Sequence, residues 1–249
     1  MVPAYHLSDL KTELKFSGPV LADIFMGTIS KWNDPKIAAL NPGIDLPDAV
    51  ITPAWRTDGS GTTFIFSNYL ATQSEDFKST VGAGKQVKWP AGQGGKGNEG
   101  VTAVVQNTNG GIGYIEQAYA DKNNIPYGAV QNKAGKFVKA SPASVSAAGE
   151  GAAKAMEGDL LASSLWDQDG DNAYPISGFT YIFIYKDLKN IKSKEQAQAL
   201  VDFLSWATHD GQKMTTEMDY APLSNAVVQK VDAALAKATW SGAPISPAK

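Results

Sequence analysis

The feature that most constrains this chain is the octapeptide RTDGSGTT at residues 56–63, which lies between two apolar runs. Residues 51–55 (ITPAW) are short and typical of a strand, whereas residues 64–70 (FIFSNYL) are typical of a helix. Gly59 and Gly61 permit a sharp turn and a close approach of the backbone to a bound group. We therefore expect a strand end, a tight turn and the first turn of a helix in direct succession.

The side chains of this turn have the chemistry of an anion site. Ser60, Thr62 and Thr63 are suited to capping the helix. The first N–H groups of a helix have no intrahelical partner, and the helix dipole places partial positive charge there. Arg56 adds a planar, charged fork that matches an oxyanion, and Asp58 can hold that fork in place. The predicted ligand is a small oxyanion, and phosphate fits best.

Catalysis is less well supported by the same residues. No lysine follows the second glycine, so the turn is not a P-loop, and Asp58 stands where a nucleophile elbow before Ser60 requires glycine. The chain has only two histidines, His6 and His209, so a serine nucleophile has few candidate bases. We predict binding without enzymatic activity. The alternatives are an enzyme that acts on phosphoesters through Ser60, and a capped turn without a ligand.

Composition excludes several other classes of protein. With 249 residues, 43% hydrophobic content and a net charge of −3, the chain is expected to be globular and not to bind nucleic acid nonspecifically. No apolar run is long enough to span a membrane, and no export signal is visible. Residues 167–171 (DQDGD) lack the glycine and glutamate positions of a calcium-binding EF-hand loop, so we predict no metal and no cofactor.

Four further stretches accompany the octapeptide in a fixed order: LADIFMGTISKWND at 21–34, GGKGNEG at 94–100, GGIGYIEQAY at 110–119 and AYPISGFTYIFIYK at 173–186. Together with residues 56–63 they resemble the PstS family, the phosphate-binding proteins of bacterial phosphate ABC importers. The resemblance runs over nearly the whole chain, to about Trp240.

This resemblance implies an α/β fold of the type II periplasmic binding protein class, in which two lobes are joined by two crossing strands and hold the ligand between them. Residues 9–175 would form one complete anion-binding lobe. Residues 1–8 and 176–249 would form a partial second lobe with the C-terminal helices. The family carries a further N-terminal segment with a Thr-Gly-Ala-Gly-type loop, a serine and an aspartate that also contact phosphate. We therefore expect a truncated chain, or one whose missing half is supplied elsewhere.

The resemblance also implies a function: high-affinity capture of inorganic phosphate and its delivery to the membrane permease of the importer, in the periplasm or at the cell surface. The anion would be contacted by Arg56, by the hydroxyls of Ser60 and Thr62, and by the N–H groups of Ser60, Gly61 and Thr62. Asp58 would support Arg56. Sulfate, molybdate or another tetrahedral oxyanion is the alternative ligand, because the family's proton-accepting aspartate lies in the absent segment. A remnant that binds nothing is a further alternative.

Outside the octapeptide, we expect strands at residues 3–7, 112–115 and 178–185, a hairpin at 130–138, and helices at 19–26, 34–40, 98–106, parts of 144–165, 193–208 and 225–239. The last two helices have an apolar face formed by Leu200, Val201, Leu204, Trp206, Val227, Val231 and Leu235. The partial second lobe lacks sheet strands to cover that face. Because large exposed apolar patches usually mark partners or a tendency to aggregate, we predict weak stability or association.

Overall fold

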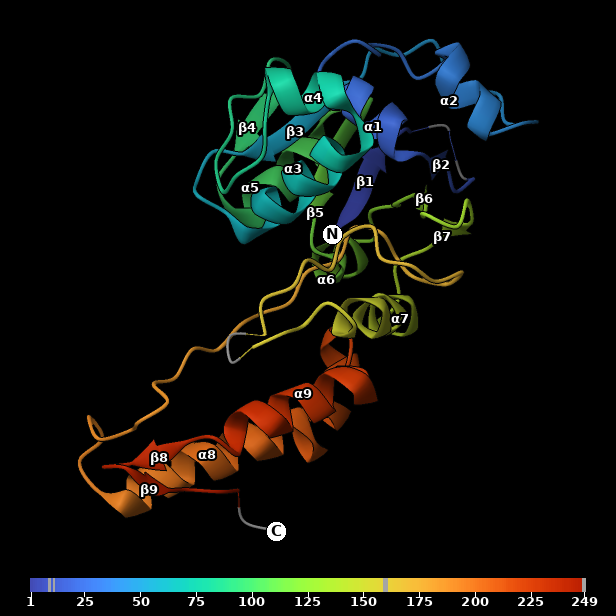
Figure 1. The fold of residues 1–249 in the computed structure, drawn as a ribbon. Coiled ribbons are helices and arrows are strands. Elements are labelled where there is room, and N and C mark those ends of the chain that lie inside the picture. The colour runs from blue at the N-terminus through green and yellow to red at the C-terminus, as the bar shows by residue number, and fades with distance from the viewer. Residues whose placement is uncertain (9, 11, 159–160, 248–249) are drawn as a thin grey trace.

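The computed structural model of the chain describes residues 1–8, 10, 12–158 and 161–247 (Figure 1). A β-sheet and its helices form the upper part of Figure 1, helix α7 (Pro142–Ala153) lies below them, and helices α8 (Lys194–Thr208) and α9 (Asn225–Leu235) lie at the opposite end. Residue 9, where the first lobe was expected to begin, lies outside the described residues. The division of the chain into two lobes stays a prediction.

The main sheet has four strands in the order β1-β5-β3-β4. They are β1 (Val2–His6), β5 (Gly111–Ile115), β3 (Thr52–Arg56) and β4 (Gln93–Gly95). Strand β3 is parallel to both β5 and β4, and β1 is antiparallel to β5. Strand β1, which lies within the residues 1–8 expected to belong to the second lobe, forms an edge of the sheet that carries the octapeptide.

Helices α3 (Gly61–Gln73) and α5 (Gly97–Asn107) cover opposite faces of this sheet. Successive residues of a strand point to opposite faces. On one face Tyr114 stacks on Phe66 of α3, with ring centroids 4.5 Å apart. On the other, a Cβ added to Gly113 would lie 2.8 Å from a side chain of α5, so only glycine allows this helix so close. The three layers place the N-terminus of α3 at the carboxyl end of β3.

Aromatic rings fill the core between α3 and helix α1 (Gly18–Phe25). Phe25 meets Phe66 edge to face at 4.8 Å, and the ring of Trp89 lies 5.6 Å from that of Tyr114. All four rings are buried. Such ring pairs stabilise a core beyond their buried area, so the face of β5 that carries Tyr114 is rigidly supported.

A second, three-stranded sheet has the order β2-β6-β7, with β2 at Lys15–Phe16, β6 at Ala129–Gln131 and β7 at Phe137–Val138. The antiparallel pairing of β6 with β7 confirms the hairpin expected at residues 130–138. Helix α2 (Pro35–Leu40) also forms as expected, because the Asp34 side chain accepts the N–H of Lys36 at its N-terminus. The remaining elements are α4 (Glu75–Thr80), α6 (Gln117–Lys122), η1 (Asp210–Met214), η2 (Thr216–Met218), β8 (Thr239–Trp240) and β9 (Ala243–Pro244).

Two helix starts differ from the prediction. Helix α5 is capped at Lys96 and has no side-chain cap, because Asn98, expected as the cap, turns its amide to the carboxylate of Glu116 instead. Helix α7 begins at Pro142, where Ser141 and Ser144 form a reciprocal capping box.

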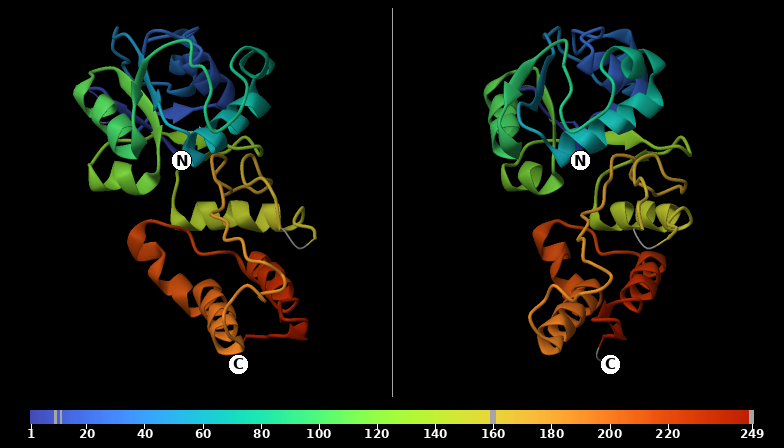
Figure 2. Two further views of the ribbon diagram at one scale, coloured as in Figure 1. Left: turned by 90° about the vertical axis from the view of Figure 1, so that its left-hand side faces the viewer. Right: turned by 60° about the vertical axis from the view of Figure 1, so that its left-hand side comes forward.

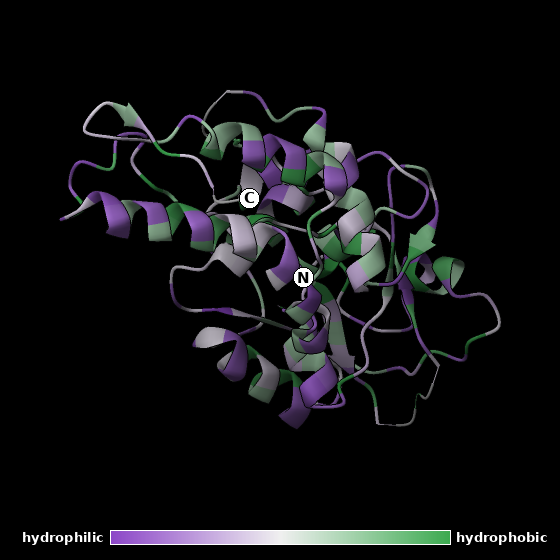
Figure 3. Cartoon of the chain, turned by 90° about the horizontal axis from the view of Figure 1, so that it is seen from below, coloured by the Kyte–Doolittle hydropathy of each residue, from purple (hydrophilic) through white to green (hydrophobic). Residues whose placement is uncertain are grey.

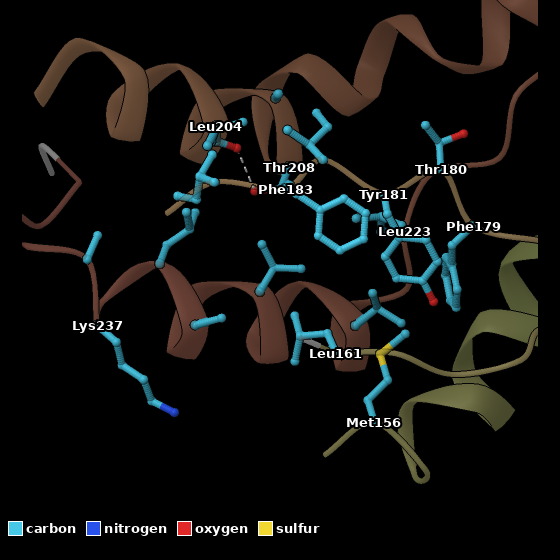
Figure 4. A pocket seen from close by; sticks show the side chains of 18 of the residues that line it. Met156, Leu161, Phe179, Thr180, Tyr181, Phe183, Leu204, Thr208, Leu223 and Lys237 are labelled. Carbon is cyan, nitrogen blue, oxygen red and sulfur yellow. Dashed lines mark hydrogen bonds between the residues drawn. The ribbon is translucent and has the colours of Figure 1, made fainter. Parts of the chain in front are cut away.

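The strand expected at residues 178–185 was wrong, because this segment forms no strand in the structure. Residues 179–185 line a cavity near α8 and α9, where the ring of Tyr181 lies between those of Phe179 and Phe183 (Figure 4). The cavity that they line has a volume of about 460 Å³. Aromatic and β-branched residues favour a strand only where a neighbouring strand is present, and none pairs with this segment among the residues described.

The C-terminal helices α8 and α9 lie side by side in every ribbon view (Figures 1 and 2). Four members of the predicted apolar face are buried, namely Val201, Leu204, Val227 and Leu235. Trp206 is 47% exposed and Phe183 76% exposed, so part of the apolar surface at this end is open to solvent. The predicted weak stability or association is not tested by these exposures and stays a prediction.

Candidate functional site

The turn between β3 and α3 is the centre of the candidate site. Strand β3 ends at Arg56 and α3 begins at Gly61, which confirms the predicted strand, turn and helix. Ser60 is the N-cap: its backbone is extended and its Oγ accepts the N–H of Thr63 at 3.1 Å. The helix N-terminus is therefore ordered by its own sequence before any ligand is present.

Arg56 and Asp58 form a bidentate ion pair within this turn. Nε of Arg56 lies 2.8 Å from Oδ1 of Asp58, and Nη2 lies 2.6 Å from Oδ2. Asp58 Oδ1 also accepts the N–H of Gly97 at 3.0 Å, which ties the pair to the start of α5. The Asp58 hydrogen bond raises the pKa of Arg56, and the same bond lowers the pKa of Asp58, so both groups are charged at neutral pH.

The third guanidinium nitrogen faces the helix N-terminus. Nη1 of Arg56 lies 3.3 Å from Oγ1 of Thr62, the second residue of α3. The Arg56 side chain is only 11% exposed, and it is the only arginine in the sequence. Its positive charge therefore adds to that of the α3 dipole in one confined place.

Gly59 and Gly61 leave open space beside the N-terminus of α3. Neither Gly59 nor Gly61 has a positive φ, so the backbone of the turn does not need glycine at either position as we expected. A Cβ built on either residue would meet no atom within 4 Å. This space beside the first turn of α3 agrees with the second role expected of them, close approach of a bound group.

One predicted donor is already occupied. The backbone N–H of Ser60 donates to the carbonyl of Lys85 at 2.8 Å, so it does not point at the anion as expected. The Ser60 hydroxyl accepts from Thr63 and keeps its own hydrogen available to donate. The donors that remain at the site are this hydroxyl, the N–H groups of Gly61 and Thr62, the hydroxyl of Thr62 and Nη1 of Arg56.

Tyr114, to which we assigned no role from the sequence, holds Arg56 and Thr63 in position from the neighbouring strand β5. Its hydroxyl accepts the backbone N–H of Arg56 at 3.1 Å and lies 2.8 Å from Oγ1 of Thr63. Burial is the main reason why the pKa of Tyr114 is raised, so the hydroxyl stays protonated. The only signal for it was its place in the stretch at 110–119, because the pairing of β3 with β5 is not visible in the sequence.

The site opens into a cavity of about 430 Å³ between distant parts of the chain. One side is formed by Arg56, residues 59–62, Asn98 and Glu116. The other side is formed by residues 177–180 and 219–221. No histidine lines this cavity, and the described residues contain no group of three or more histidine, aspartate or glutamate side chains that could hold a metal ion.

No helix within the described ranges is both long and apolar enough to cross a membrane. The view from below agrees, because the long helices there mix hydrophilic and hydrophobic residues (Figure 3).

Comparison with known sequences identifies relatives. Residues 1–210 match a family model described as a PBP superfamily domain. The phosphate-binding protein PstS of Pasteurella multocida (strain Pm70) is 46% identical over 235 residues, which cover 93% of this chain and 67% of the relative. PstS of Haemophilus influenzae (strain ATCC 51907 / DSM 11121 / KW20 / Rd) is 43% identical over 232 residues, which cover 93% of this chain and 68% of the relative. PstS of Xylella fastidiosa (strain 9a5c) is 43% identical over 236 residues and is covered to 63%, so the chain spans about two thirds of the length of these relatives.

Solved structures share the fold. A high-affinity periplasmic phosphate-binding protein (PfluDING) bound with phosphate superposes with a TM-score of 0.66 at 20% identity, over 93% of this chain and 68% of that one. The ancestral soluble variant of the Human Phosphate Binding Protein superposes with a TM-score of 0.67 at 18% identity, over 93% of this chain and 69% of that one. At these identities the likeness concerns the α/β fold alone. The sequence relatives show that this chain belongs to the PstS family of phosphate-binding proteins.

Proposed function

We propose that this chain binds inorganic phosphate as the solute-binding component of an ABC-type phosphate importer and delivers it to the membrane permease. The observation that carries the proposal is the Arg56 fork, which Asp58 holds beside the N-terminus of α3. Relatives named phosphate-binding proteins support the choice of anion. One structural neighbour is described as periplasmic, which supports a periplasmic location.

The donors of the turn suit a tetrahedral oxyanion. Arg56 supplies a fixed charge, Ser60 and Thr62 supply hydroxyls, and Gly61 and Thr62 supply backbone N–H groups. Hydrogen bonds to a charged group contribute roughly 1.5–3 kcal/mol each. Ser60 and Thr62 are 3% and 5% exposed, so little water competes for these donors once the anion is seated.

Sulfate is the second candidate ligand, and one observation favours it. Phosphate carries a proton at neutral pH that sulfate lacks, and recognising that proton needs a free acceptor. Asp58, the carboxylate nearest in sequence to the turn, accepts three hydrogen bonds from Arg56 and Gly97. Its acceptor capacity is therefore committed to positioning the guanidinium, and discrimination against sulfate has to come from another group.

We propose that the chain is not an enzyme. The Ser60 hydroxyl has no adjacent base to take its proton, because no histidine lines the cavity among the residues described. A serine nucleophile needs an adjacent base that is itself oriented by a third group. Hydrolysis of a generic phosphoester that is lost in a Ser60→Ala variant would overturn this part of the proposal.

Because Arg56 is the only arginine, its chemical modification reports on the site directly. We expect phenylglyoxal to modify the intact protein once, as measured by mass spectrometry, and phosphate to slow that reaction. Chloride at equal ionic strength is the control for screening. A modification rate that phosphate and chloride change equally would contradict anion binding at Arg56.

A further inference from the structure

Tyr220 connects the C-terminal part of the chain to the part that carries the anion site. Its hydroxyl donates to Oε2 of Glu116 at 2.9 Å, although the two residues are 104 positions apart in sequence. Glu116 directly follows β5 and precedes the first residue of α6, whereas Tyr220 follows η2. The contact therefore joins the two sides of the 430 Å³ cavity that contains Arg56.

Glu116 is held in place from its own side of the cavity. Nδ2 of Asn98 donates to Oε1 of Glu116 at 2.9 Å, and Asn98 is 8% exposed at the start of α5. Oε1 thus accepts from the anion-site side and Oε2 from the C-terminal side. A carboxylate whose two oxygens receive donors from both sides is suited to fastening those sides together.

Tyr220 is likewise tied to its own side. The N–H of Tyr220 donates to the carbonyl of Thr215 at 2.9 Å, after a left-handed residue, Asp219, reverses the chain. The side chain of Gln212 accepts the N–H of Leu223 at 2.8 Å, which anchors the same loop to η1. Movement of the C-terminal helices relative to the sheet would therefore strain the Tyr220 contact directly.

We propose that the hydrogen bond between Tyr220 and Glu116 is a latch that closes the cavity over the bound anion and slows its release. The latch residues retain the anion without contacting it. This inference rests on the proposed function for the identity of the ligand, and on the described contacts for the closure itself.

The electrostatics of the pair agree with this role. The hydrogen bond to Glu116 is the largest of the effects that raise the pKa of Tyr220 to about 12, so the tyrosine remains a donor at neutral pH. Tyr220 is 50% exposed, and water can replace Glu116 as its partner. The expected effect on release is therefore several-fold and not many orders of magnitude.

The test compares phosphate dissociation rates by stopped-flow tryptophan fluorescence in wild type, Tyr220→Phe, Glu116→Ala and the double variant. Tyr119→Phe is the matched control, because Tyr119 on α6 also donates to a glutamate at 2.9 Å, but that glutamate, Glu99, lies on the neighbouring helix α5 of the same sheet-bearing part of the chain. We expect phosphate release to be about three- to tenfold faster in Tyr220→Phe than in wild type and unchanged in Tyr119→Phe. Adding Glu116→Ala to Tyr220→Phe should not accelerate release any further, because both substitutions remove the same hydrogen bond. Equal rates in Tyr220→Phe and Tyr119→Phe would overturn the latch.

A second readout separates the latch from the proposed function. The chain has no cysteine, so Asp76→Cys on α4 and Gln229→Cys on α9 accept a pair of spin labels without competing sites. We expect Tyr220→Phe to broaden the distribution of distances between the labels, and Tyr119→Phe to leave it as in wild type. If wild type fails to bind phosphate, the proposed function fails, and this distribution still decides the latch: an unchanged distribution in Tyr220→Phe overturns it.

Discussion

The guanidinium of Arg56 and the carboxylate of Asp58 are joined by two parallel hydrogen bonds, Nε to Oδ1 at 2.8 Å and Nη2 to Oδ2 at 2.6 Å. The pair is separated by one residue, so a turn of the backbone brings both groups to one side. Two guanidinium nitrogens are thereby committed to orientation, and Nη1 is left facing Thr62 and the N-terminus of α3. The site is ordered before an anion arrives.

Replacing Arg56 by lysine keeps a positive charge but removes the fork. Lysine cannot hold both oxygens of Asp58 and also reach toward Thr62, so we expect the affinity for phosphate to fall about tenfold to a hundredfold. The measurement is equilibrium binding at fixed ionic strength. Lys78→Arg is the control, because it exchanges the same two side chains without changing the net charge at an exposed residue that pairs with Glu75 on α4. An affinity in Arg56→Lys equal to that of the control would contradict the role of the fork.

Asp58→Asn should weaken phosphate binding by the same factor at about pH 5 and about pH 6, where phosphate is mainly in one ionisation state. The Arg56 hydrogen bond lowers the pKa of Asp58 in the folded protein. A lowered carboxyl pKa contributes stability above the unfolded value of about 3.9, and this contribution is lost only as the pH falls through the lowered folded value. Asp58 is therefore ionised at both test pH values. A ratio of wild-type to variant affinity that changes between them would show that Asp58 titrates there.

Two glycine-to-alanine substitutions should affect different properties, phosphate affinity at Gly61 and stability at Gly92. Gly61→Ala adds a methyl group into open space, so we expect the free energy of unfolding to be nearly unchanged and phosphate affinity to fall. Gly92→Ala places a Cβ 2.0 Å from the carbonyl of Pro53 at a φ of +93°, so we expect destabilisation of about 1 kcal/mol or more. Denaturant unfolding and phosphate titration of both variants test this. Unchanged affinity in Gly61→Ala would contradict close approach of the anion at that residue.

At the octapeptide the local structure could be predicted from the sequence. The strand, the turn and the helix followed from local signals, because capping by Ser60 and pairing of Arg56 with Asp58 involve residues a few positions apart. Long-range pairing was not predictable in this way. The hydroxyl of Tyr114 reaches Arg56 only because β5 lies beside β3, and the N–H of Ser60 is taken by Lys85 from a loop.

The segment at residues 178–185 shows the limit of local propensity. Its aromatic and β-branched composition predicts a strand, but a strand also needs a partner, and none pairs with it in the part of the chain that the structure describes. Glu116 and Tyr220 were missed for a related reason: a contact across 104 positions depends on how the two parts of the chain are arranged, and no short motif encodes it.

The exposed rings of this segment should make the chain self-associate. Phe183 is 76% exposed beside the apolar cavity between α8 and α9, so we expect Phe183→Ser to shift the protein toward monomer at micromolar concentration. Val50→Ser is the matched control, because Val50 is 64% exposed but lies on the sheet-bearing part of the chain. Sedimentation velocity measures the distribution. Wild type that is monomeric and unfolds in one sharp transition at high temperature would contradict both the association and the weak stability.

Isothermal titration of the purified chain measures whether the Arg56 turn binds phosphate. Phosphate and, separately, sulfate are titrated into wild type and into Arg56→Ala at one ionic strength. We expect saturable heat with phosphate in wild type and none in Arg56→Ala. Saturable phosphate heat of the same affinity in Arg56→Ala, or no phosphate heat in wild type, would contradict phosphate binding by this turn.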